Sequence, residues 1–279
     1  MSINQNQCVG VFDSGVGGLS VVREIQKLLP RAPLFYIADQ AHVPYGKRQL
    51  DEILAFSLAI SRFLISKGAR VIVVACNTAS AAALAVLRES LPGTPFVGME
   101  PAVKPATQQT ENGIVGVLAT PATFQGRMYS TLVERFAQNV RILTNTLPGL
   151  VEAVERGELN SLATRAILEA AIQPMLAEGA DTLVLGCTHF PFVLPLIREI
   201  AGPEVKVIDP APAIARRTAY LLEQSAITFA ENTETKPVFA TTGDALKFKS
   251  AIRQLLDMDA EPVQLAWNEA AYHLIEKRK

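Results

Sequence analysis

Short apolar runs recur along the chain and alternate with longer stretches in which apolar and polar residues follow a helical spacing. An uninterrupted apolar run of four to six residues is typical of a strand that is buried on both faces, as in a parallel sheet covered by helices. The pattern predicts strands at 9–12, 34–38, 71–74, 95–98, 113–119, 140–143, 181–186 and 238–240. It predicts helices at 19–29, 49–66, 79–90, 121–136, 161–178, 213–224 and 244–256, a short helix that begins near 150, and a polar loop at 231–236.

One block of this pattern occurs twice. Cys76 and Cys187 each come eight residues after the glycine of a Gly-Ala pair and directly after an apolar strand. A helix with Arg-Glu follows each cysteine, and each block then reaches a short strand that ends in an acidic residue and a proline, Glu100-Pro101 and Asp209-Pro210. Four matches in register indicate an internal duplication.

The duplication predicts an α/β protein with two pseudo-symmetric lobes. Each lobe would be a mainly parallel sheet flanked by helices, and the active site would lie in the cleft between them. We take the two acid–proline pairs as the crossings between lobes. The first lobe would then hold residues 1–99 plus 210–279, and the second lobe residues 100–209.

Composition narrows the class of protein. The 279 residues carry a net charge of −1, which gives no basic surface for nucleic acid or for a membrane. No apolar run reaches the ~18 residues of a membrane helix, and the N-terminus has no signal-peptide pattern. The three cysteines lack the spacing of a disulfide framework, which indicates reduced thiols in the cytoplasm. The three histidines are scattered along the chain, which indicates that there is no metal site.

The two cysteines are the strongest candidates for chemistry. A free cysteine often has no role beyond packing in the core. These two cysteines, however, are each predicted at a strand end beside a helix N-terminus, where α/β proteins bind ligands. Because a helix N-terminus stabilises a thiolate, we expect the pKa of these thiols to be lowered. If the lobes face each other, the two sulfur atoms lie on opposite sides of one carbon, as stereoinversion by two bases requires. Asp13 would lie near Cys76, and His189 and Glu152 would lie near Cys187. Side chains of the right type to hold a carboxylate and an ammonium are Ser14, Asn77, Thr78 and Thr188.

The loop Gly15-Val16-Gly17-Gly18 allows a different interpretation. It follows a strand and precedes a helix, as a dinucleotide-binding loop does, and Asp39 follows the next strand. Ser20 stands where the fingerprint needs its third glycine, and the carboxylate of Asp13 would face the pyrophosphate. A nucleotide-dependent oxidoreductase therefore remains an alternative, as does a two-lobed binding protein without chemistry.

The chain resembles the glutamate racemases of the cofactor-independent aspartate/glutamate racemase family. Four motifs carry the resemblance: Phe12 to Gly18, Val43-Pro44-Tyr45-Gly46, Ala75-Cys76-Asn77-Thr78 and Gly186 to Pro191. Weaker matches are Gly116 to Thr120 with Thr123, Leu150-Val151-Glu152, and Thr241-Thr242-Gly243-Asp244.

The resemblance implies interconversion of L- and D-glutamate without a cofactor, to supply D-glutamate for peptidoglycan, by a cytoplasmic enzyme that forms a homodimer. It implies that Cys76 and Cys187 are the two bases, assisted by Asp13, His189 and Glu152. It also implies substrate contacts from Asp13, Ser14, Tyr45, Gly46, Asn77, Thr78, Thr188 and His189, with Thr120 and Thr123 as further candidates. An aspartate racemase of the same family is the alternative within this mechanism, because the residues do not fix the length of the substrate side chain.

Overall fold

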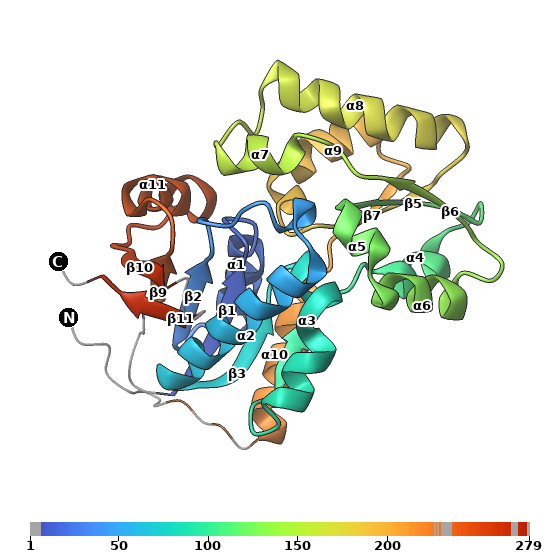
Figure 1. The fold of residues 1–279 in the computed structure, drawn as a ribbon. Coiled ribbons are helices and arrows are strands. Elements are labelled where there is room, and N and C mark those ends of the chain that lie inside the picture. The colour runs from blue at the N-terminus through green and yellow to red at the C-terminus, as the bar shows by residue number, and fades with distance from the viewer. Residues whose placement is uncertain (1–6, 226, 228, 230–235, 269–272, 278–279) are drawn as a thin grey trace.

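The computed structural model describes residues 7–225, 227, 229, 236–268 and 273–277, and within these residues it contains two β-sheets flanked by helices (Figure 1). Residues 231–235 of the loop predicted at 231–236 lie outside the described residues. The α/β architecture with two lobes of mainly parallel sheet is confirmed.

The larger sheet has seven strands in the order β11-β10-β9-β2-β1-β3-β4, and only β10 and β11 pair antiparallel. Its strands are β1 (Cys8–Asp13), β2 (Leu34–Ala38), β3 (Ala69–Val74), β4 (Phe96–Gly98), β9 (Val238–Thr241), β10 (Val263–Asn268) and β11 (His273–Glu276). One face is covered by α1 (Leu19–Leu28), α10 (Ala211–Gln224) and α11 (Ala245–Leu256), and the other by α2 (Leu50–Ser66) and α3 (Asn77–Ser90). The short 3₁₀ helix η1 (Tyr45–Lys47) lies between β2 and α2. Because helices cover both faces of this sheet, both faces of its central strands are buried, and these strands are apolar throughout.

The smaller sheet has four parallel strands in the order β6-β5-β7-β8. Its strands are β5 (Ile114–Ala119), β6 (Arg141–Asn145), β7 (Thr182–Gly186) and β8 (Lys206–Ile208). The helices around it are α4 (Val103–Gln109), α5 (Pro121–Gln125), α6 (Arg127–Phe136), α7 (Leu150–Glu155), α8 (Leu162–Ala177) and α9 (Leu194–Ala201), with the 3₁₀ helix η2 (Phe190–Val193) before α9.

The strand order β2-β1-β3-β4 in one sheet corresponds to β6-β5-β7-β8 in the other. Cys76 follows β3, and Cys187 follows the corresponding strand β7. The registers also correspond, since Phe12 of β1 pairs with Val74, two residues before Cys76, and Leu118 of β5 pairs with Leu185, two residues before Cys187. The sequence repeat is therefore a repeat of topology, and it brings each cysteine to the carboxyl edge of its sheet.

Two features differ from the sequence prediction. The predicted helix at 121–136 is two helices, because Gly126 has an extended backbone (φ −69°, ψ 135°) between α5 and α6. A Cβ on Gly126 would lie 2.7 Å from the Cβ of Ala81 in α3, so the break occurs where the second lobe packs closely on the first.

The prediction also missed α4, β10 and β11. Helix α4 is short and polar and contains Pro105, and β11 is an edge strand with mostly exposed residues.

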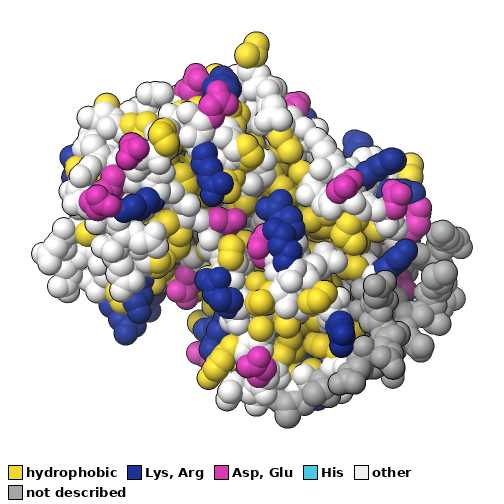
Figure 2. All heavy atoms as spheres, turned by 180° about the vertical axis from the view of Figure 1, so that it is seen from behind, with side chains coloured by type: hydrophobic (Ala, Val, Ile, Leu, Met, Phe, Trp, Pro, Cys, Tyr) yellow, Lys and Arg dark blue, Asp and Glu magenta, His cyan; other side chains and the backbone are white. Residues whose placement is uncertain are grey.

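The surface seen from behind carries Lys and Arg side chains interspersed with Asp and Glu, in keeping with the net charge of −1 (Figure 2). None of the helices in the described residues is long and apolar enough to cross a membrane.

Candidate active site

Cys76 lies at the junction of β3 and α3. Strand β3 is buried from Val71 to Val74, so the chain leaves it at the carboxyl edge of the sheet and turns into α3 with Cys76 as the N-cap residue. Its Sγ atom accepts a hydrogen bond from the backbone N–H of Ala79 at 3.4 Å and lies 4.0 Å from Ser14 Oγ. The thiol is thus held in the first turn of a helix, where backbone N–H groups point at it.

Asp13 ends β1, next to β3, and is fully buried. Its Oδ2 atom accepts hydrogen bonds from the backbone N–H groups of Gly18 at 2.9 Å and Gly15 at 3.2 Å. Burial raises the pKa of Asp13, although the charge of His189 and the Gly18 N–H oppose the rise. A carboxyl group with a raised pKa exchanges protons more readily near neutral pH than an ordinary aspartate does.

Cys187 lies directly after β7, in the second lobe, and its Sγ atom is 3.7 Å from Nδ1 of His189. His189 is 2% exposed, and its other ring nitrogen, Nε2, lies 2.7 Å from Oε1 of Glu155. Burial by itself would lower the pKa of His189, but its contacts with Cys187 and Glu155 outweigh burial and raise that pKa well above the ordinary value. His189 is therefore placed to exchange a proton with the Cys187 sulfur.

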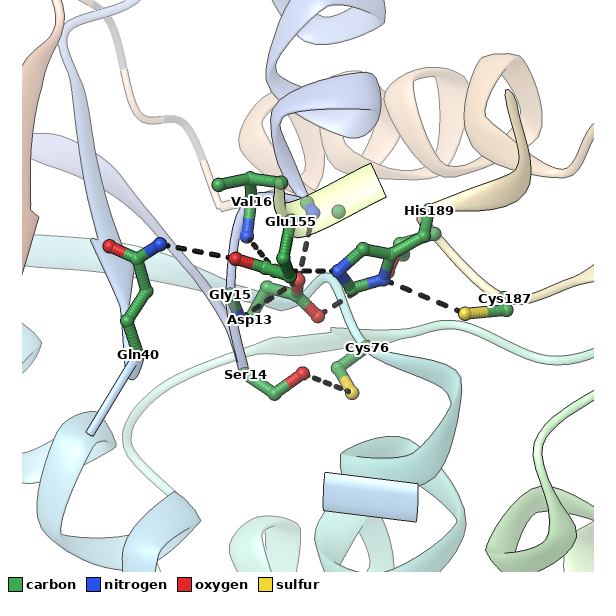
Figure 3. A network of polar contacts seen from close by, with 12 residues as sticks. Asp13, Ser14, Gly15, Val16, Gln40, Cys76, Glu155, Cys187 and His189 are labelled. Carbon is green, nitrogen blue, oxygen red and sulfur yellow. Dashed lines mark hydrogen bonds and ion pairs between the residues drawn. The ribbon is translucent and has the colours of Figure 1, made fainter. Parts of the chain in front are cut away.

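Glu155, at the end of α7, anchors this histidine (Figure 3). Its Oε1 atom also accepts the backbone N–H of Val16 at 2.7 Å, and its Oε2 atom accepts from Nε2 of Gln40 at 3.1 Å. Burial opposes the charge of Glu155, but the bonds from His189, Val16 and Gln40 outweigh it and lower its pKa. The result is a buried carboxylate–imidazole pair behind Cys187.

A small cavity separates the two thiols. It is lined by Ser14, Pro44, Tyr45, Gly46, Cys76, Asn77, Thr78, Thr120, Val151, Cys187, Thr188 and His189, which come from both lobes. About 20 Å³ of it is open to the centre of a water molecule, which is room for about one water. The walls are therefore close together in this structure.

Two polar features of the cavity wall can serve a ligand. The hydroxyls of Thr78 and Thr120 are 2.8 Å apart, and that of Thr123 is 2.9 Å from Thr120, so a chain of hydroxyls crosses from one lobe to the other. Asn77 is 3% exposed, and neither Oδ1 nor Nδ2 of its side chain has a hydrogen-bond partner within the described part of the chain. A buried amide without a partner is costly, so Asn77 is well placed to bind a polar ligand.

Comparison with known proteins places the chain in a family. A profile of the Asp/Glu/Hydantoin racemases matches residues 10–218, which include both Cys76 and Cys187. The chain belongs to this racemase family.

Individual family members are similar over nearly the whole chain. A glutamate racemase of Roseiflexus sp. (strain RS-1) is 46% identical over 267 residues, 95% of this chain and 98% of the relative. One from Ectopseudomonas mendocina is 47% identical over 264 residues, 93% of this chain and 98% of the relative. The crystal structure of glutamate racemase isoform RacE1 from Bacillus anthracis superposes with a TM-score of 0.84 at 32% identity, covering 94% of this chain and 98% of that one.

The Escherichia coli glutamate racemase, solved with L-glutamate and the activator UDP-MurNAc-ala, has a TM-score of 0.81 at 33% identity. The match covers 93% of this chain and 97% of that one.

The structure brings most of the residues singled out in the sequence to the cavity of this racemase, but not Glu152. The Glu152 carboxylate is 31% exposed and pairs with Lys47 Nζ at 2.6 Å, while Glu155, one turn later, contacts His189. The assisting role that the sequence analysis gave to Glu152 therefore fits Glu155. Both glutamates lie on one short helix, and nothing in their spacing favours the second. Only the position of α7 against His189 and Val16 distinguishes them.

Tyr45 and Gly46 both line the cavity, as expected of residues near a ligand, and each also contacts other parts of the protein. The hydroxyl of Tyr45 donates to Oδ2 of Asp39 at 2.6 Å, so this hydroxyl is already hydrogen-bonded within the protein. Gly46 packs against Thr120, and a Cβ there would lie 3.0 Å from the Thr120 Cβ. Thr188 lines the cavity, and its Oγ1 also donates to Asp13 Oδ1 at 3.4 Å.

The expectation of a lowered pKa for Cys76 is wrong for this arrangement. Burial raises the pKa of Cys76 well above the ordinary value, the charge of Asp13 adds to the rise, and the Ala79 N–H only partly opposes it. The helix N-terminus is outweighed because the thiol is buried beside an acid.

The glycine loop is not shaped for a dinucleotide. Asp13 already accepts the N–H groups of Gly15 and Gly18 that a pyrophosphate would need. A Cβ at Gly17 would lie 2.4 Å from His189 Nδ1, so these glycines allow the second lobe to pack on the loop. Asp39 is occupied as well, by four protein donors. Within the described residues, no group of three or more His, Cys, Asp or Glu side chains is placed to hold a metal ion.

Proposed function

We propose that this racemase interconverts L- and D-glutamate by proton transfer at Cα between two cysteine side chains, without a cofactor, and supplies D-glutamate for peptidoglycan. Family membership supports the reaction class. Glutamate as the substrate is supported by the glutamate racemases that are 46% and 47% identical over nearly the whole chain.

The observation that carries the proposal is the placement of Cys76 and Cys187 at equivalent strand ends of two lobes, in the wall of one cavity. A single base returns a proton to the face from which it came, whereas two opposed bases allow inversion. One sulfur, as thiolate, takes the proton from Cα, and the other, as thiol, gives its proton to the opposite face. In the reverse direction the two exchange roles, so no net proton is consumed.

The neighbouring groups have separate tasks in this proposal. Asp13 assists Cys76, and His189, oriented by Glu155, assists Cys187. Ser14, Asn77, Thr78, Thr120, Thr123 and Thr188 bind the carboxylates and the ammonium of the substrate, together with free N–H groups at the start of α3. Glutamate has ten non-hydrogen atoms and the cavity has room for about one water. Substrate therefore enters when the lobes move apart.

The lobe boundaries belong to the proposal too: residues 1–99 plus 210–279, and residues 100–209. Their support is that α4 contacts β5 and β7, while α10 contacts α1 and β3. A cytoplasmic homodimer remains the expectation, and light scattering of the purified protein tests the dimer.

The decisive experiment is proton exchange. Purified protein in deuterium oxide should incorporate deuterium at Cα of L- and D-glutamate with no added cofactor, followed by proton NMR. Absence of exchange with both enantiomers would refute the proposal. Exchange into aspartate at a higher kcat/KM than into glutamate would instead establish the aspartate racemase.

A further inference from the structure

A second polar centre lies behind the cavity, at Asp39. This residue follows β2 and is fully buried. Its Oδ2 atom accepts from the Tyr45 hydroxyl at 2.6 Å and lies 2.9 Å from His42 Nδ1, and its Oδ1 atom accepts from Thr242 Oγ1 and from Trp267 Nε1, both at 2.7 Å. A carboxylate has about four acceptor positions, so the protein itself satisfies all of them.

The four donors come from distant parts of the chain. His42 and Tyr45 belong to the segment that connects β2 with α2, Thr242 follows β9, and Trp267 is in β10. Asp39 therefore ties the segment that forms part of the cavity wall to the C-terminal strands of the same sheet. The 241–244 motif and the 43–46 motif, far apart in sequence, meet at this carboxylate.

Aromatic rings enclose the centre. The ring of His42 stacks on Phe56 with centroids 3.9 Å apart, and the Trp267 ring lies 5.3 Å from that of Phe56. Hydrogen bonds in such a low-dielectric surrounding are strong and hold their geometry. The hydroxyl of Tyr45 is thus held by Asp39, while Tyr45 as a residue lines the cavity.

The fixed position matters because the next residue touches the second lobe. Gly46 packs against Thr120 so closely that even a Cβ would lie 3.0 Å from the Cβ of Thr120. Thr120 is the middle member of the hydroxyl chain that crosses the cavity. A shift of Tyr45 would therefore move the cavity wall and a proposed substrate contact together.

Gln40, beside Asp39, extends the link to the other side of the site. Its Nε2 atom donates to Glu155, and its Oε1 atom accepts from Thr241 Oγ1 at 2.8 Å. Asp39 and Gln40 thus both bind the turn at 241–242. Asp39 connects this turn to Tyr45 in the cavity wall, and Gln40 connects it to the Glu155–His189 pair.

We propose that Asp39 is a positioning residue of the racemase site, which fixes the Tyr45–Gly46 wall of the substrate cavity and connects it to Trp267. This inference rests on the proposed glutamate racemisation. Asp39 does not line the cavity and acts through Tyr45. Trp267 is the single tryptophan of the chain, so its fluorescence reports on the Asp39 centre and should change when substrate binds against the wall.

The test compares Asp39→Asn with Asp181→Asn. Asp181 is a matched control, because its carboxylate also accepts four bonds, from Thr110, Glu111, Asn112 and Thr182, but lies just before β7, at the strand end remote from Cys187. In either variant, the NH₂ group of the asparagine faces a hydrogen-bond donor that the carboxylate had accepted from, so one hydrogen bond is lost. Asp39→Asn should lower kcat/KM for both enantiomers by about tenfold to a hundredfold, as misplaced binding groups do, while Asp181→Asn should leave kcat/KM within about twofold.

A second arm removes only the hydroxyl that joins the wall to Asp39. Tyr45→Phe should also lower kcat/KM by about tenfold, and the double variant with Asp39→Asn should be little worse than Asp39→Asn alone, because both changes break one link. Glutamate should change the Trp267 fluorescence of the wild type saturably, with a midpoint near KM, and this response should be lost in Tyr45→Phe.

Each outcome decides the matter. Equal effects of Asp39→Asn and Asp181→Asn on kcat/KM, multiplicative effects in the double variant, or an unchanged fluorescence response in Tyr45→Phe would each overturn the inference. If Asp39→Asn does not fold, Tyr45→Phe decides alone. An active wild type with unaffected variants refutes the positioning role only, whereas an inactive wild type refutes the proposed function and this inference with it.

Discussion

Replacing Glu155 by glutamine tests the acid–base chain behind Cys187. The substitution preserves size but removes the carboxylate that lies 2.7 Å from His189 Nε2. Burial alone lowers the pKa of His189, and Glu155 is one of the two partners that raise it. We therefore expect the pKa of His189 to fall and its ring to lose its fixed orientation, so that proton transfer at Cys187 slows.

The size of the effect follows from the histidine. Positioned acid–base groups contribute about 10²- to 10⁴-fold to rate. Glu155→Gln leaves the imidazole in place but removes its carboxylate partner, so kcat should fall by about 10²-fold. Exchange of the Cα proton with solvent deuterium should slow mainly for one enantiomer, the same one that Cys187→Ser impairs.

Glu152→Gln is the matched control, because it changes the same side chain one turn earlier on α7. Glu152 is partly exposed and pairs with Lys47, and exposed ion pairs of this kind contribute about 1 kcal/mol or less. Its kcat should stay within about fivefold of the wild type. The reasoning is refuted if Glu152→Gln loses more activity than Glu155→Gln, or if Glu155→Gln slows both enantiomers equally while thermal unfolding shows an intact fold.

Two further predictions concern titration. The charge of Asp13 adds to burial in raising the pKa of Cys76. In a variant in which Cys76 is the sole cysteine, Asp13→Asn should therefore lower the pH at which the alkylation rate reaches half its maximum. A rise in this midpoint pH would contradict the prediction. The Glu155–His189 pair should stabilise the fold most between about pH 4.5 and 6.5. The lowered pKa of Glu155 gives stability that is lost as pH falls below its unfolded value near 4.5, and the raised pKa of His189 gives stability that is present below about 6.5 and lost as pH rises through its folded value. Urea unfolding of wild type and Glu155→Gln across pH checks this, and a difference that grows above pH 8 would contradict it.

The strands and the paired cysteines could be predicted because the information is local. An apolar run such as 71–74 specifies a buried strand without reference to the rest of the chain, and equal glycine–cysteine spacing places Cys76 and Cys187 at equivalent strand ends. The break at Gly126 could not be predicted in this way, because the residue that a side chain there would meet, Ala81, lies on a helix of the other lobe.

The supporting polar groups were harder to predict because their partners are far away in sequence. Gln40 and Glu155 are separated by 115 residues, and Asp39 and Trp267 by 228. No periodicity relates such pairs. The sequence therefore favoured Glu152 on α7, whereas Glu155 contacts His189 in the folded chain. It indicated Asp39 only as the acid that follows the second strand of a possible dinucleotide site, whereas the folded chain uses Asp39 to hold Tyr45.

The contacts of the two acids show how the closed cleft and the chemistry depend on each other. Asp13, at a strand end of the first lobe, accepts a bond from Thr188 of the second lobe. Glu155, on a helix of the second lobe, accepts bonds from Val16 and Gln40 of the first. Each acid is thus held in part by the opposite lobe. In the proposed mechanism, separation of the lobes to admit substrate would break these bonds as it moves the thiols apart. The two cysteines and the two acids would then be brought together in one step, when the cleft closes.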